Sequence, residues 1–168
     1  MMLSDRALSA WFWIFAFIAM VFEPLYYFGC DWNGASCEYD AVANVWAIYA
    51  QWDPFFWDMR KSELLWLRVM CTIEVFVFGP CYAACAVGLA PTRPEGDHAA
   101  WLRGVALPFC GALVYSTFVY FAVEYMEATA SGANMPMVVL INAPWTVLPS
   151  LLLAKCLGGD HKRWHKAA

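Results

Sequence analysis

The sequence predicts an all-α integral membrane protein, a four-transmembrane-helix bundle with a short interfacial helix between spans 1 and 2. Four apolar runs are each about 20 residues long, which is the length that a helix needs to cross the hydrocarbon core of a bilayer. Hydrophobic residues make up 62% of the chain and charged residues 14%, whereas about half and about a quarter are usual in a soluble domain. Because no internal repeat or low-complexity segment divides the chain, residues 1–168 are predicted to form a single membrane domain.

The first two spans are predicted at about residues 11–29 and 64–89. The first run follows a short N-terminal segment and has no small-residue cleavage site behind it, so it is interpreted as a retained span rather than a signal peptide. Between the two spans, apolar residues recur at helical spacing from Val42 to Trp52. They predict an amphipathic helix that lies in the membrane interface and ends before Pro54.

The third and fourth spans are predicted at about residues 104–125 and 137–157. In a four-span arrangement, Arg6, Arg93, Arg103 and the basic C-terminal residues lie on one side, and the positive-inside rule places both termini in the cytoplasm. The polar turn between Cys30 and Cys37 then faces the opposite side, where a disulfide could form in an oxidising compartment. Since the basic residues form no stripe, nucleic-acid binding is excluded.

Glu23 is a carboxylate within the first apolar run. An ionised group at membrane depth costs roughly 2.5 to 3.5 kcal/mol on insertion scales, so it is rare without a function or a partner. Glu74 stands near the middle of the second span. The alternative is that Glu23 only anchors a helix end at the interface beside Pro24, and that Glu74 serves packing alone.

Polar and aromatic residues recur at helical spacing on every predicted span, and four such stripes facing inward would form a pocket. The stripes contain Glu23, Tyr26 and Tyr27; Cys71, Glu74 and Phe78; Thr117, Tyr120 and Glu124; and Asn142 and Trp145. Such a pocket suits a large, flat, hydrophobic ligand with one cationic or polar feature. A buried glutamic acid there could also deliver a proton to an alkene or epoxide while a second carboxylate stabilises the cation.

The order of these motifs resembles the EXPERA family, which includes sterol isomerases of the emopamil-binding-protein type and sigma-2 receptors. The resemblance covers about residues 11–157. Its carrying segments are FEPLYY at 22–27, WAIYAQWDP at 46–54, EVFVFGP at 74–80, YFAVE at 120–124 and NAPW at 142–145. The resemblance implies a membrane bundle of the endoplasmic reticulum, often a homodimer, whose hydrophobic cavity binds sterols and amine-bearing molecules.

In the isomerase type, acids on the first two helices and a histidine one turn before the first acid move a ring double bond through a carbocation. Glu23 matches the first acid, but the histidine position is Ala19. The second acid position of the isomerase type is Cys71, whereas Glu74 matches the acid of the sigma-2 type. Asp53 fits both types, and an Asp before a proline most often orders a turn.

Two hypotheses follow. The first is a membrane isomerase or cyclase, without metal or other cofactor, that acts on a sterol-like, isoprenoid or epoxide-bearing substrate through Glu23 as proton donor or cation stabiliser and Glu74 as the complementary acid or base. The second is a non-catalytic sterol- or amine-binding protein of the sigma-2 type in lipid trafficking or chaperoning. In both, the ligand-contacting residues are expected to be Tyr27, Asp53, Thr117, Tyr120, Glu124, Asn142 and Trp145.

Overall fold

All regular elements in the described part of the chain are helical. The computed structural model describes residues 3–29, 40–54, 56, 65–90, 98, 101–128 and 132–158. Four helices within these ranges are long and apolar enough to cross a membrane: Asp5–Tyr26, Leu65–Gly88, Leu102–Glu127 and Met135–Gly158. The predicted four-span fold with a short helix between spans 1 and 2 is confirmed, and the protein is a multi-pass membrane protein. The predicted disulfide of Cys30 and Cys37 lies outside the described residues.

The first span begins at Asp5, earlier than predicted. It consists of α1 (Asp5–Phe17), the π-helical segment η1 (Ile18–Phe22) and α2 (Glu23–Gly29). The hydroxyl of Ser4 caps α1 by accepting a hydrogen bond from the Ala7 backbone N–H at 3.2 Å. Because of this cap, the charged residues that follow Ser4 belong to the first helical turn rather than to a preceding loop.

The later spans keep close to their predicted bounds. The second comprises α5 (Leu65–Ile73), the π-helical segment η2 (Glu74–Phe78) and α6 (Gly79–Gly88). The third comprises α7 (Leu102–Val123) and η3 (Glu124–Ala128). The fourth comprises α8 (Met135–Asn142) and α9 (Pro144–Gly158). The short helix between spans 1 and 2 is α3 (Asp40–Tyr49), which ends before the predicted position and continues as a turn to Asp53.

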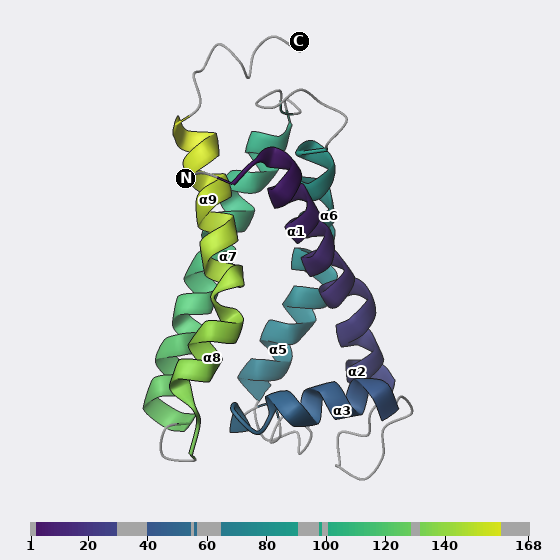
Figure 1. Ribbon diagram of the computed structural model, residues 1–168, viewed down its shortest axis with the longest axis vertical. Helices are drawn as coiled ribbons and strands as arrows, with labels where there is room; N and C mark the ends of the chain where they lie inside the picture. The colour runs from purple at the N-terminus through teal and green to yellow at the C-terminus, as the bar shows by residue number, and fades with distance from the viewer. Residues whose placement is uncertain are drawn as a thin grey trace.

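The bundle is tightly packed in the half that contains the start of α1 and the end of α9 (Figure 1). There α1 packs against α6, and α7 packs against α9. Their buried apolar side chains, among them Phe12, Phe15, Tyr82 and Leu152, form one core. The approach of α6 to α7 is close at Gly88, where an added Cβ would lie only 2.7 Å from Leu102 Cδ1.

At the opposite end of the bundle, α3 lies across the ends of the spans (Figure 1). Val45 and Ile48 on α3 are half exposed, whereas Trp46 stacks on Phe56 with ring centroids 5.0 Å apart. Apolar residues on one face of α3 and aromatic packing on another fit a helix that lies in the membrane interface.

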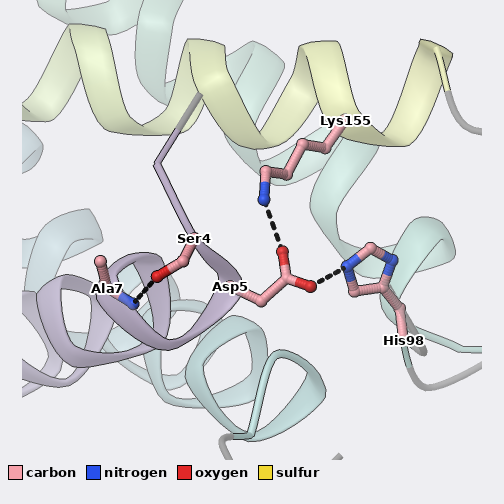
Figure 2. A network of polar contacts seen from close by, with 5 residues as sticks. All are labelled: Ser4, Asp5, Ala7, His98 and Lys155. Carbon is pink, nitrogen blue, oxygen red and sulfur yellow. Dashed lines mark hydrogen bonds and ion pairs between the residues drawn. The ribbon is translucent and has the colours of Figure 1, made fainter. Parts of the chain in front are cut away.

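A polar network joins three segments at the end of the bundle away from α3 (Figure 2). Lys155 Nζ on α9 lies 2.6 Å from Asp5 Oδ1, and His98 Nε2, from the segment between α6 and α7, lies 3.0 Å from Asp5 Oδ2. Asp5 is buried, so its carboxylate fixes the start of α1 against the fourth span through Lys155 and against the connection between α6 and α7 through His98.

Candidate functional site

A cavity of about 300 Å³ lies between the spans in the half of the bundle that α3 crosses. Its volume is at the lower end of the range usual for small-molecule sites, and its walls are mainly apolar and aromatic. Six of the predicted site residues line it: Glu23, Glu74, Thr117, Tyr120, Asn142 and Trp145. The structure therefore brings residues of all four spans, including Glu23 of the first and Glu74 of the second, to one cavity.

Two other predicted site residues, Asp53 and Glu124, are not part of the cavity lining. Asp53 and Glu124 are fully buried behind the lining, so they reach the cavity only through neighbouring side chains. The side chain of Tyr27 lies outside the described part of the structure, although its backbone belongs to α2.

Glu23 and Glu74 are both positioned by a π turn that is followed by a proline. Pro24 and Pro80 have no backbone N–H, and the ring of a proline crowds the carbonyl four residues before it. In both spans the helix widens into a π turn just before the proline: the Glu23 N–H bonds to the Ile18 carbonyl, and the Gly79 N–H bonds to the Glu74 carbonyl. These π turns, η1 and η2, pack against each other, so the two acids approach the same space from adjacent helices.

The crossing of these two spans is made of small residues. Ala19 is 1% exposed. A Cβ added to Gly79 would lie 3.4 Å from Ala19 Cβ and 2.6 Å from Met20 Cγ. The close approach of the helices thus leaves no room for a larger side chain at Gly79 unless Met20 moves.

Glu74 is held by two hydrogen-bond donors. The Tyr82 hydroxyl donates to Glu74 Oε1 at 2.7 Å, and the Trp145 indole N–H, a second donor, interacts favourably with this carboxylate without a hydrogen bond of ordinary geometry. Tyr82 is fully buried between Phe15 and Phe109, at centroid distances of 5.3 and 5.1 Å. Because both donors bind the charged form, they stabilise Glu74 as a carboxylate.

Tyr82 was not predicted as a site residue. In a regular α-helix, residues eight apart are rotated by about 80° from each other, so the sequence pattern places Tyr82 off the face of Glu74. The wider turn of η2 brings it back toward that face. A proline six residues after a membrane glutamate, Pro80 after Glu74, is the sequence signal that could have indicated this change of register.

Glu23 has a different environment. Its Oε2 atom is buried and makes no hydrogen bond within the described part of the chain. The carboxyl group of Glu74 interacts electrostatically with that of Glu23. The cavity therefore contains two carboxyl groups with unequal support, one held by donors and one with an unbonded oxygen.

A chain of polar side chains leads from the cavity to Asp53. The Asn142 amide donates to the Tyr49 hydroxyl at 2.7 Å, and the Tyr49 and Tyr120 hydroxyls are 3.1 Å apart. The Tyr120 hydroxyl in turn donates to Asp53 Oδ2. Tyr49 lines the cavity and was absent from the predicted site, although it belongs to the WAIYAQWDP segment.

Comparison with known proteins identifies the family. The EXPERA (EXPanded EBP superfamily) family matches residues 41–156, which contain α3, the second and third spans and most of the fourth. The first span, with Glu23, precedes the matched region. No curated protein and no solved structure matches this chain. Since the match covers more than half of the sequence, the predicted family is confirmed, and the protein belongs to the EXPERA family, which includes sterol isomerases and sigma-2 receptors.

Proposed function

We propose that this EXPERA protein is a membrane isomerase or cyclase that uses buried carboxyl groups to transfer protons on a hydrophobic sterol-like, isoprenoid or epoxide-bearing substrate. The observation that carries the proposal is the unequal support of the two acids in one apolar cavity. Glu74 accepts a hydrogen bond from Tyr82 and interacts favourably with Trp145, whereas Glu23 has a buried oxygen without a hydrogen bond in the described chain. Two ionised carboxylates in this cavity would repel each other, so the proton belongs on Glu23.

The reaction that fits this pair conserves protons. Glu23 transfers its proton to an alkene carbon or an epoxide oxygen, which leaves Glu23 ionised and a carbocation on the substrate. The Glu74 carboxylate and the face of the Trp145 ring stabilise this positive charge. One of the two carboxylates then removes a proton from a neighbouring carbon, which forms the new double bond.

A second candidate function is the binding of a sterol or an amine without turnover. Two features of the sequence favour it. The acid of the second span is Glu74, which matches the sigma-2 type, whereas the position that matches the second acid of the isomerase type is Cys71. The position that matches the histidine of the isomerase type is Ala19. A desolvated carboxylate beside aromatic rings would bind an ammonium group well. For either function we propose the endoplasmic reticulum as the location and a homodimer, as the family resemblance implies, and cytoplasmic termini, as the distribution of basic residues indicates.

The deciding experiment is turnover in deuterated water. The purified protein in lipid nanodiscs is incubated with panels of sterols and isoprenoid epoxides, and products are analysed by mass spectrometry. The proposal predicts a rearranged product that contains deuterium, and its loss in Glu23→Gln. Tyr115→Phe is the control, because Tyr115 is 72% exposed and the variant should retain activity. Tight binding of sterols or amines without turnover of any substrate would instead support the binding function.

A further inference from the structure

Two more carboxyl groups lie together behind the cavity, where the turn after α3 meets the third span. Asp53 and Glu124 are both fully buried, and the Asp53 carboxyl interacts with that of Glu124. Neither carboxylate oxygen of Glu124 makes a hydrogen bond of ordinary geometry within the described residues. Burying two ionised acids side by side costs several kcal/mol, and a shared proton removes the repulsion between them.

This carboxyl pair is connected to the cavity by hydroxyl groups. Tyr120 donates to Asp53, and Tyr49, whose hydroxyl is 3.1 Å from that of Tyr120, also interacts with Asp53. Both tyrosines line the cavity, whereas the two acids do not. Burial and the Asp53 carboxylate raise the pKa of Tyr49, so its hydroxyl keeps its proton and can relay one without ionising.

The pair also lies close to the end of the bundle. Glu124 begins η3, and Glu127, about one turn later, is exposed and acts electrostatically on Glu124. The carboxyl pair thus stands between an exposed acid at the end of the third span and the hydroxyls on the cavity wall.

We propose that Asp53 and Glu124 share a proton, and that Tyr120 and Tyr49 pass protons between this pair and the cavity. The four residues would form a proton-exchange route from the α3 end of the bundle to the Glu23 site. This inference rests on the proposed function, because a route for protons matters only if the cavity performs proton transfer.

The transfer balances in every step. The Tyr120 hydroxyl first rotates from Asp53 toward Tyr49. The pair then gives its proton to the Tyr120 oxygen while the Tyr120 proton moves to the Tyr49 oxygen and the Tyr49 proton moves to an oxygen in the cavity, either that of a water molecule or that of a bound ligand. A proton from water at the exposed side, through Glu127, restores the pair. A purely structural contact would not require two acids, since an amide at either position could supply hydrogen bonds without the cost of a buried charge.

Infrared spectroscopy of the protein in nanodiscs tests the shared proton directly, since the C=O stretch of a protonated carboxyl is separate from that of a carboxylate. We expect a protonated carboxyl band that disappears in both Glu124→Gln and Asp53→Asn. Thermal unfolding identifies any variant that does not fold, and either variant alone suffices for the assignment. If the protonated bands are unchanged in these folded variants, the shared proton is refuted.

The route is tested by the rate at which the protonated Glu23 band, assigned with Glu23→Gln, shifts when H₂O is replaced by D₂O. The double variant Tyr49→Phe/Tyr120→Phe is expected to slow this exchange by at least about tenfold, since it removes both relaying hydroxyls. The matched control is Tyr115→Phe/Tyr125→Phe, whose side chains are 72% and 69% exposed, and it should exchange like the wild type. Exchange at the wild-type rate in the first double variant would overturn the route.

These measurements need no substrate, so the two proposals fail separately. A protein that turns over no substrate but shows the shared band and the slowed exchange would retain the route and lose the proposed enzyme activity. If wild-type Glu23 shows no protonated band, that result counts against Glu23 as the acid of the proposed reaction. The shared proton of Asp53 and Glu124 is then judged by its own band alone.

Discussion

Replacing Tyr82 with phenylalanine is expected to weaken the binding of cations in the cavity. The change removes the hydroxyl that donates to Glu74 at 2.7 Å but keeps the ring between Phe15 and Phe109. A hydrogen bond to a charged group contributes about 1.5 to 3 kcal/mol. At about 1.4 kcal/mol per factor of ten, its loss corresponds to a roughly 10- to 150-fold decrease in affinity. The Trp145 indole still interacts favourably with Glu74, so the carboxylate keeps part of its support in the variant.

The assay is isothermal titration of a hydrophobic tertiary amine into the protein in nanodiscs. Both candidate functions require a site for positive charge, so the prediction holds for either. Tyr115→Phe is the control, because the same change at an exposed position should leave the affinity as in the wild type. If folded Tyr82→Phe binds the amine as tightly as the wild type does, Glu74 is not the group that holds the cation, and the assignment of roles within the acid pair is wrong.

Two further predictions concern stability and are tested by thermal unfolding in detergent. Gly88→Ala is expected to destabilise the protein by about 1 to 3 kcal/mol through overpacking, since the new Cβ would lie 2.7 Å from Leu102 Cδ1 and 3.1 Å from Leu102 Cβ. Gly111→Ala, which meets no atom within 4 Å, should leave stability unchanged or raise it by up to about 1 kcal/mol; equal effects of the two changes would contradict the close approach. Asp5→Asn should cost about 1 to 3 kcal/mol, because Lys155 loses the carboxylate that it binds at 2.6 Å. A double-mutant cycle with Lys155→Met that shows no coupling would exclude a contribution from this pair.

The fold could be predicted because a bilayer imposes a length on each span. About 20 apolar residues are required regardless of what the helices contact, so the four runs were visible without any tertiary information. The boundaries depend on local hydrogen bonds instead. The first span was predicted to begin at Trp11 but begins at Asp5, because the cap by Ser4 draws a charged turn into the helix.

The cavity-facing residues were predictable where the helix is regular. In α7 and across the junction of α8 and α9, helical spacing places Thr117, Tyr120, Asn142 and Trp145 on the lining. The second span shows why the pattern fails elsewhere. Phe78 was predicted on the face of Glu74, but it packs in the core against Phe109 at a centroid distance of 5.5 Å, because a π turn lies between the two positions. A spacing rule based on 3.6 residues per turn does not apply through such a segment.

The two π turns also explain why the acids stand where the packing changes. On one side of η1 and η2, the first two spans form the tight core that includes Phe15 and Tyr82. On the other side of η2, residues such as Leu67 and Cys71 line the cavity, and in the first span the lining begins within η1, at Ile18 and Phe22. Each π turn ends two residues before a proline, so the same interruption of the hydrogen-bond ladder widens both helices at this level. Since Glu23 follows one interruption and Glu74 begins the other, the irregularity that separates the core from the cavity is also what presents two carboxyl groups at the boundary between them.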